Sequence, residues 1–154
     1  SDLVVELIES RRKDLFPVGR LDKDTEGLIL ISNDGQLAHQ LISPKYHVDK
    51  KYYVSVDLQF PWRIEEELAK GIPLGDFVSK PARFEKIDAT HGYLTIQEGK
   101  YHQAKRMMEY FKCKVIYLKR VEFGFLNLEG LEAGEYRKLS EEEVARLKGE
   151  FWNR

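Results

Sequence analysis

The 154-residue sequence lacks, or nearly lacks, several features that define whole classes of protein. Cys113 is its only cysteine, so no disulfide can form within the chain; this suits a reducing compartment, and we expect a cytoplasmic protein. No apolar run approaches the roughly 20 residues of a membrane-spanning helix, so we expect no membrane partner. There is no GxGxxG motif and no P-loop, and the four histidines and the cysteine do not have the spacing of metal ligands. These absences argue against a nucleotide-binding fold and a resident metal.

Charge is balanced overall but unevenly distributed. The sequence has 25 Lys and Arg against 26 Asp and Glu, a net charge of −1 that by itself argues against a nucleic-acid partner. Between residues 99 and 120, however, the sequence has seven basic residues and only one acidic residue, Glu109. Such a region is typical of RNA binding, although a solvated helix face beside a strand would have the same composition. The seven are Lys100, Lys105, Arg106, Lys112, Lys114, Lys119 and Arg120.

The apolar pattern predicts one α+β domain with a largely antiparallel sheet, because strand-like and helical segments do not alternate regularly. Helical spacing occurs at residues 3–9, 36–41, 62–70, 103–111 and 140–147. A capping box, Ser140-x-x-Glu143, opens the last of these helices. Strand-like runs occur at residues 15–18, 28–32, 50–56, 77–87, 93–96, 115–118, 121–123 and 135–139.

A charged loop directly precedes the apolar run that begins at residue 28. Charge beside a core is costly unless it is paired or used, and three interpretations follow. The loop is an ordinary turn in which Asp22 or Asp24 accepts hydrogen bonds from the backbone. It is a calcium loop, an interpretation weakened because the twelfth position, which needs Glu, is Asn33. Or it presents one reactive carboxylate beside the cation of Arg20.

Two further side chains have both a structural and a functional interpretation. In a strand over residues 50–56, Tyr52 shares a face with Val54, as a core tyrosine would. In a helix over residues 103–111, Lys105 can pair with Glu109 one turn away. The residues alone leave both alternatives open.

Four motifs in the same order resemble those of the RsuA/RluA superfamily of RNA pseudouridine synthases. The catalytic motif is similar to GRLDKDTEGLIL at residues 19–30, the second to KYYV at 51–54 and the third to EGKYHQAKRM at 98–107. A C-terminal segment with Leu118, Arg120 and EYRKL at 135–139 completes the resemblance. The third motif is more similar to the small-subunit (RsuA-type) enzymes, because large-subunit relatives typically have Asn-Arg-Gln near His102 and Gln103.

The resemblance implies a pseudouridine synthase fold: a bent, mainly antiparallel sheet with flanking helices and a central RNA-binding cleft. It implies isomerisation of a uridine in ribosomal RNA, 16S rather than 23S, without a cofactor; a non-catalytic RNA-binding module is the alternative. Asp22 would be the ionised nucleophile or base and Tyr52 would lie under the target base. Lys105 would be the cation beside Asp22, with Arg20 and Arg106 as rivals for that place. The expected RNA contacts are Arg20, Lys51, Lys100, His102, Gln103, Arg106 and Arg120.

The resemblance also sets an expectation for the domain organisation. Members of this subfamily usually have an N-terminal S4-like RNA-binding domain and a strand with a KPxG pattern before the catalytic motif. Here 18 residues precede Gly19, and neither feature is among them. We therefore expect residues 1–154 to be the catalytic domain of a longer, monomeric protein whose partner is ribosomal RNA in an assembly intermediate.

Overall fold

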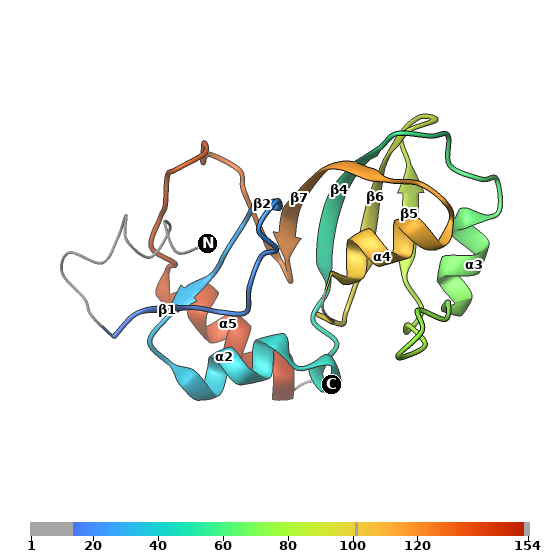
Figure 1. Ribbon diagram of the computed structural model, residues 1–154. Helices are drawn as coiled ribbons and strands as arrows, with labels where there is room; N and C mark the ends of the chain where they lie inside the picture. The colour runs from blue at the N-terminus through green and yellow to red at the C-terminus, as the bar shows by residue number, and fades with distance from the viewer. Residues whose placement is uncertain (1–13, 101, 153–154) are drawn as a thin grey trace.

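The fold has two halves that share one long, curved strand (Figure 1). A computed structural model describes residues 14–100 and 102–152. The helices are α2 (Gly35–Ile42), α3 (Ile64–Lys70), α4 (Gln103–Tyr110) and α5 (Glu141–Trp152), with a 3-10 turn η1 at Pro44–Tyr46. The strands are β1 (Phe16–Pro17), β2 (Glu26–Gly27), β3 (Ile31–Ser32), β4 (Lys50–Val56), β5 (Arg83–Lys86), β6 (His91–Ile96), β7 (Val115–Phe123) and β8 (Leu126–Asn127).

The main sheet has the strand order β2-β7-β4-β6-β5, with β8 also paired to β7. Only β2 runs parallel to its neighbour, β7; the other pairings in this sheet are antiparallel. The register between β4 and β7 shifts twice, between Lys51 and Tyr52 and between Ser55 and Val56. Such irregularities increase strand twist, and β7 curves from one half of the molecule into the other in Figure 1. The predicted α+β fold with a bent, mainly antiparallel sheet is confirmed.

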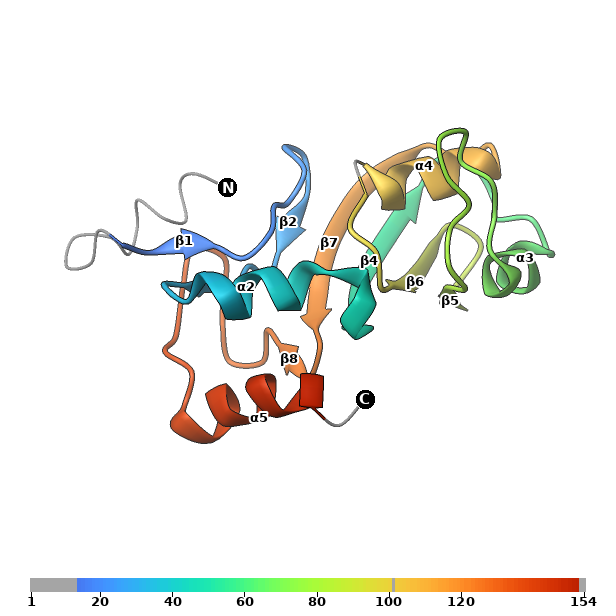
Figure 2. The same ribbon diagram turned by 90° about the horizontal axis from the view of Figure 1, so that it is seen from below.

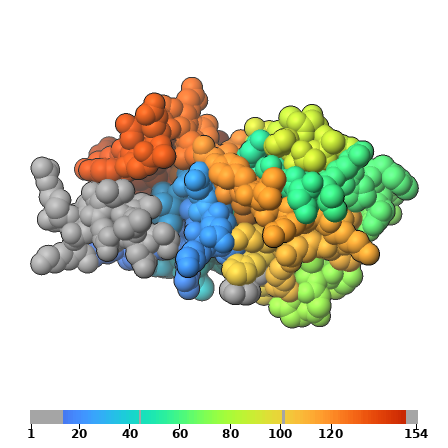
Figure 3. Space-filling model, turned by 45° about the horizontal axis from the view of Figure 1, so that its top comes forward, coloured from blue at the N-terminus to red at the C-terminus, as the bar shows by residue number. Residues whose placement is uncertain are grey.

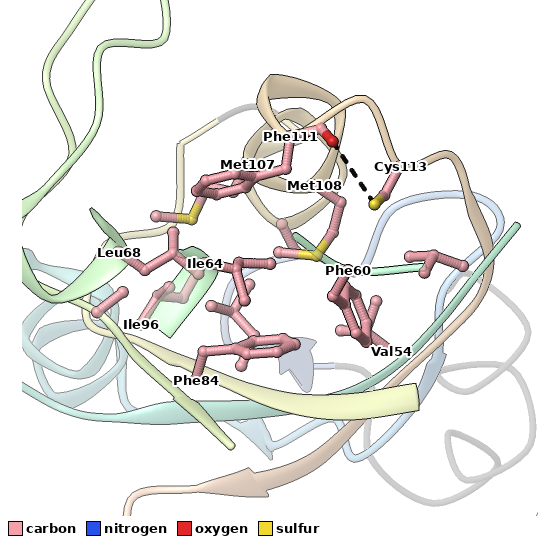
Figure 4. Close-up of a cluster of buried hydrophobic side chains, with 14 of the residues drawn as sticks. Val54, Phe60, Ile64, Leu68, Phe84, Ile96, Met107, Met108, Phe111 and Cys113 are labelled. Atoms are coloured by element: carbon pink, nitrogen blue, oxygen red, sulfur yellow. Dashed lines mark hydrogen bonds between the residues drawn. The ribbon is translucent and has the colours of Figure 1, made fainter. Parts of the chain in front are cut away.

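Each half has its own hydrophobic cluster. The first cluster, shown in Figure 4, lies between β4–β7 and the helices α3 and α4, and includes Val54, Leu68, Met107 and Leu118. The second cluster lies in the other half of the molecule, which contains α2 and α5 and which Figure 2 shows beside β7. It includes Phe123. Leu118 and Phe123 are in register with Val54 and Lys50, which share one face of β4, because the register shift at Lys51 and Tyr52 offsets the alternation of β7. β7 therefore contributes Leu118 to one cluster and, past the bend, Phe123 to the other.

Cys113 is part of the first cluster. It is buried, and its Sγ lies 3.7 Å from the carbonyl oxygen of Phe111, the contact drawn in Figure 4. Burial raises the pKa of the Cys113 thiol. The thiol therefore stays protonated and fills space in the core.

Most predicted elements are present, and the helices at 36–41, 62–70 and 103–111 each appear within two residues of the expected ends. The exceptions depend on strand pairing. The run at 28–32 is not one strand: the chain leaves β2 at Gly27, whose φ is +113°, and pairs again only in β3. The run at 77–87 is a strand only from Arg83, after Pro81, which cannot donate a ladder hydrogen bond.

Three further expectations have other outcomes. The strands predicted at 115–118 and 121–123 are one continuous strand, β7. The prediction of a strand at 135–139 is wrong. This segment is mostly exposed and forms no strand, and Arg137 pairs with Glu143 of α5 instead. The helix predicted at 3–9 lies outside the described residues. Within the part of the chain that the structure describes, no helix is long and apolar enough to cross a membrane.

Candidate active site

The charged loop at residues 20–26, called the Asp22 loop below, is a short turn attached to buried backbone. The amide of Thr25 donates to the carbonyl oxygen of Asp22 at 2.9 Å, which closes the turn. Below it, the Val18 amide donates to the Leu30 carbonyl at 2.7 Å, and Val18 and Leu30 are both buried. The Asp22 side chain itself is 28% exposed. The loop therefore presents a carboxylate at the surface from a fixed backbone.

A second attachment joins the loop to β7. The Tyr117 hydroxyl donates a hydrogen bond of 2.7 Å to the Glu26 carboxylate. Burial, and then this hydrogen bond, raise the pKa of Tyr117 to about 12. Tyr117 is therefore a neutral donor at physiological pH, and Glu26 is held at the end of the loop that leads into β2.

The His102 imidazole, and not the Lys105 ammonium, lies next to the Asp22 carboxylate. His102 Nε2 is 3.8 Å from Asp22 Oδ1, and the two side chains are 38% and 28% exposed. The Lys105 Nζ lies instead 3.7 Å from Asp24 Oδ2. The structure thus differs from the expectation that Lys105 faces Asp22, because His102 precedes the first turn of α4 and reaches the loop first.

The backbone of His102 explains its position. It is the N-cap of α4 and has left-handed dihedrals, φ 49° and ψ 34°, which are uncommon for a residue with a side chain. Its side chain makes no capping hydrogen bond to the helix. The side chain is therefore directed by the turn and is left to face the Asp22 loop.

Gln103 and Glu98 form the interior support of this turn. The Gln103 Nε2 donates to Glu98 Oε1 at 2.8 Å, and the Gln103 Oε1 accepts from the Lys100 amide at 3.2 Å. Glu98 also accepts hydrogen bonds of 3.1 and 3.2 Å from the Lys80 amide. Both side chains are buried. The expected RNA contact of Gln103 is therefore disfavoured by its place in the interior, where it shapes the turn that carries His102.

Arg106 is directed away from the Asp22 loop. Its Nη2 donates to the Leu74 carbonyl at 2.6 Å and to the Asp76 carboxylate. The hydrogen bond from Arg106 lowers the pKa of Asp76. Arg106 thus joins α4 to the segment before β5, and its place beside Asp22, an alternative in the sequence interpretation, is not supported.

Tyr52 lies on the inner face of the sheet. It is half-buried, packs against the first hydrophobic cluster, and is paired across strands with Leu94 and Arg120. Residues directly opposite each other in an antiparallel pair project from the same face, so Arg120 is its neighbour on that face. Tyr52 is thus on the same side of β7 as the buried side chain of Arg120.

Lys51 projects from the opposite face, as the alternation of a strand requires. Its Nζ lies 3.6 Å from Glu122 Oε2 and 3.8 Å from Glu85 Oε1. It also lies 4.6 Å from the centre of the Tyr93 ring. Lys51, an expected RNA contact, therefore lies on the opposite face of the sheet from Tyr52.

The remaining expected RNA contacts divide into exposed and buried side chains. Arg20 and Lys100 are exposed, with Lys100 Nζ 5.6 Å from the centre of the Phe77 ring. Arg120 is 3% exposed and its Nε donates to the Leu28 carbonyl at 2.8 Å. Direct RNA contact is therefore compatible with the positions of Arg20 and Lys100, and burial disfavours it for Arg120.

The calcium interpretation of the loop does not fit these contacts. Asp22 and Asp24 lie near two different side chains, His102 and Lys105, rather than around one common site. Among the described residues, no group of three or more His, Cys, Asp or Glu side chains is arranged to hold a metal ion. In Figure 3 the segment that contains the loop, in blue, lies against the yellow start of α4.

Comparison with known proteins identifies the class to which this fold and site belong. The family described as RNA pseudouridylate synthase matches residues 6–110. A solved structure titled as a pseudouridylate synthase superimposes with a TM-score of 0.88 at 38% identity, over 94% of this chain and 64% of that chain. The chain belongs to the RNA pseudouridylate synthase family, and the resemblance seen in its motifs is confirmed.

Relatives include proteins named for both ribosomal subunits. The chain is 47% identical over 149 residues to the RNA pseudouridine synthase YtzG of Bacillus subtilis, and 39% identical over 152 residues to the ribosomal large subunit pseudouridine synthase B of that organism. It is 42% identical over 134 residues to the ribosomal small subunit pseudouridine synthase A of Escherichia coli K12. These matches cover 92%, 95% and 85% of this chain but 62%, 62% and 58% of the relatives. The chain therefore spans about three fifths of the relatives' length.

Proposed function

We propose that this chain isomerises a uridine of ribosomal RNA to pseudouridine, with Asp22 as the reacting carboxylate. The observation that carries the proposal is the position of Asp22: on a closed turn, partly exposed, and 3.8 Å from an imidazole. The turn belongs to the GRLD motif of a chain that is a member of the family. A carboxylate held in this way is suited to attack or proton abstraction, because its backbone does not have to be reorganised.

The reaction needs one reacting group and no external co-reactant. The N1–C1′ bond of the uridine breaks, the uracil turns, and a C5–C1′ bond forms while the C5 proton leaves to solvent and N1 gains one. Nothing is oxidised or hydrolysed in the net reaction, so no cofactor is required. Attack of Asp22 on C1′, attack on the uracil ring, and abstraction of the C2′ proton all satisfy this balance.

Two side chains near the loop support a well-positioned Asp22. The His102 Nε2 lies 3.8 Å from Asp22 Oδ1, and the Lys105 ammonium lies 3.7 Å from the neighbouring Asp24 carboxylate. Bound RNA would exclude water from these groups and strengthen their interactions.

Tyr52 is the proposed platform for the target base. A uridine in folded RNA has to leave its stack before a side chain can reach it, which costs a few kcal/mol. Stacking on an aromatic ring returns about 1–3 kcal/mol. The ring of Tyr52 packs against the first hydrophobic cluster and is only partly buried, so part of it is accessible to a base.

We further propose that the substrate is 16S ribosomal RNA. The support is the third motif, in which His102 and Gln103 occupy positions where large-subunit enzymes typically have Asn-Arg-Gln. Small-subunit and large-subunit enzymes are both among the relatives at similar identity. A 23S substrate is therefore the second candidate.

Release of tritium from [5-³H]uridine-labelled RNA tests the proposal, because C5 loses its hydrogen in the reaction. Full-length 16S and 23S transcripts and the corresponding assembly particles are the substrates. We expect release from 16S RNA with the wild-type chain and less than about one percent of that rate with Asp22→Asn. Asp24→Asn is the matched control two residues away, and it should keep most of the rate. RNA binding without release by the wild type would instead support a non-catalytic module.

A further inference from the structure

Arg120 lies in the sheet directly between the Asp22 loop and the strand of Tyr52. On one side of β7, Arg120 is in register with Gly27 of β2. On the other side it is in register with Tyr52 of β4. One residue of the curved strand thus separates the strand that follows the proposed catalytic loop from the strand of the proposed stacking ring.

The contact with the loop side is unusually close. The Leu28 amide donates to the Arg120 carbonyl at 2.7 Å, and the Arg120 Nε donates back to the Leu28 carbonyl at 2.8 Å. Gly27 has φ +113°, and a Cβ placed there would lie 2.1 Å from the Arg120 carbonyl oxygen. Residues 27 and 28 therefore cannot shift along β7 without breaking both hydrogen bonds. Asp22 is one closed turn away, through the hydrogen bond from Thr25.

The Arg120 side chain is a costly choice for stability alone. It is 3% exposed, and its Nη2 has no hydrogen-bond partner among residues 14–100 and 102–152. Its guanidinium carbon is 5.2 Å from the centre of the Phe123 ring, and Lys50 Nζ lies 5.8 Å from the same ring. Replacing a buried, incompletely paired charge by an apolar residue is often neutral or stabilising. Such a residue is better explained by a role in holding geometry.

We propose that Arg120 is a positioning residue that fixes the placement of the Asp22 carboxylate relative to the Tyr52 ring. This inference rests on the proposed function and deepens it. The two hydrogen bonds between Arg120 and Leu28 fix the position of the loop, and the β4–β7 pairing fixes the position of Tyr52. One residue, Arg120, therefore determines where both proposed partners of the target uridine lie. A misplacement of reacting groups by about 1 Å can cost about 100-fold in rate.

Three variants of the chain test the inference. Arg120→Met removes the donor to Leu28 at similar side-chain length, and Arg120→Lys keeps a charge and one donor. Lys50→Met is the matched control: it removes the other buried cation at the Phe123 ring, and its Nζ donates to the Gln97 carbonyl rather than to the loop. Single-turnover tritium release, the RNA dissociation constant and the melting temperature are measured for each.

We expect Arg120→Met to lower the single-turnover rate by about 10- to 100-fold at saturating RNA, with the dissociation constant within about twofold of wild type. Arg120→Lys should restore part of the rate but not all of it, and Lys50→Met should keep the wild-type rate. A wild-type rate in both Arg120 variants overturns the inference. So does weaker RNA binding at an unchanged rate, which would make Arg120 an RNA contact. A rate loss that follows the melting temperature in all three variants would make Arg120 merely structural. If Arg120→Met does not fold, Arg120→Lys decides the test, because a wild-type rate would overturn the inference.

Hydrogen exchange separates a failure of this inference from a failure of the proposed function. If the wild-type chain releases no tritium from any RNA, the proposed function fails, but the loop can still be examined. Arg120→Met should then accelerate exchange at the Leu28 and Thr25 amides, whose acceptors are the Arg120 and Asp22 carbonyls, and Lys50→Met should not. Unchanged exchange in Arg120→Met would show that its side chain does not hold the loop.

Discussion

His102 lies 3.8 Å from Asp22 across a gap of 80 residues in the sequence, whereas Lys105, one turn further along α4, lies beside Asp24. This relationship changes which side chain of the third motif is expected to support the reacting group. The His102 ring nitrogen can hydrogen-bond to the Asp22 carboxylate, whereas the Lys105 ammonium is placed to interact with Asp24. Loss of His102 should therefore affect the reaction more than loss of Lys105.

We predict that His102→Ala lowers the single-turnover rate by about 10-fold at saturating RNA, because the ring beside the Asp22 carboxylate is lost. Lys105→Met should keep the rate and weaken RNA binding, since its ammonium lies near the exposed Asp24. Single-turnover rates and RNA dissociation constants measure the two effects. The reverse pattern would return the pairing role to Lys105, as the motif alone suggested.

Tyr52 provides the second prediction. If its ring stacks on the uracil and its hydroxyl is not used, Tyr52→Phe keeps most of the rate and Tyr52→Ala loses it. If the hydroxyl also moves a proton, Tyr52→Phe binds RNA normally but reacts about 10² to 10⁴ times more slowly. Tyr53→Phe is the control on the opposite face of β4, where its ring packs against Tyr93. Wild-type rates for both Tyr52 variants would remove this residue from the site.

Elements with a strong local pattern could be predicted from the sequence. β4 has the bounds 50–56 that its aromatic and β-branched residues indicated, and α5 begins with the predicted capping box, in which Ser140 and Glu143 exchange hydrogen bonds. Both depend on neighbours a few residues away. The segments at 28–32 and 135–139 were not predicted correctly, because a strand also needs a partner that is distant in the sequence.

The site was predictable to the same extent. The motifs named Asp22 and Tyr52 as candidate site residues, but periodicity and spacing contain no information on which basic side chain of the third motif lies beside the loop. That outcome depends on the left-handed backbone of His102, a conformation for which the sequence gives no glycine or asparagine as a signal. The burial of Gln103 and Arg120 was missed for a related reason, since polar residues are usually expected at the surface.

Lys50 provides a prediction about stability and pH. Burial, and then the nearby charge of Arg120, lower the pKa of Lys50 from 10.5 to about 8 in the folded chain. The unfolded chain therefore binds more protons between pH 8 and 10.5, and stability rises with pH in this window by up to about 1.4 kcal/mol per pH unit. Urea unfolding of wild type and Lys50→Met between pH 7 and 10 measures the difference. Lys86→Met, at an exposed position, should show the wild-type slope, and equal slopes in all three would contradict the prediction.

The start of α5 provides an acid-side prediction. Ser140 Oγ accepts from the Glu143 amide at 3.1 Å and Glu143 accepts from the Ser140 amide at 2.9 Å, so Ser140→Ala should cost about 1 kcal/mol of unfolding free energy. Glu143 also accepts two hydrogen bonds of 2.8 Å from Arg137, and these, first among the causes, lower the pKa of Glu143 to about 2.

Because this pKa lies below the usual value of 4.5, the contribution of Glu143 is fully present above pH 4.5 and is lost as pH falls toward 2. We therefore expect the difference in melting temperature between wild type and Glu143→Gln to shrink between pH 5 and 3. Glu142→Gln, in the same first turn, is the control for the general effect of negative charge at a helix N-terminus. An equal pH dependence for the two variants would show that the helix dipole, and not the pairing with Arg137, is responsible.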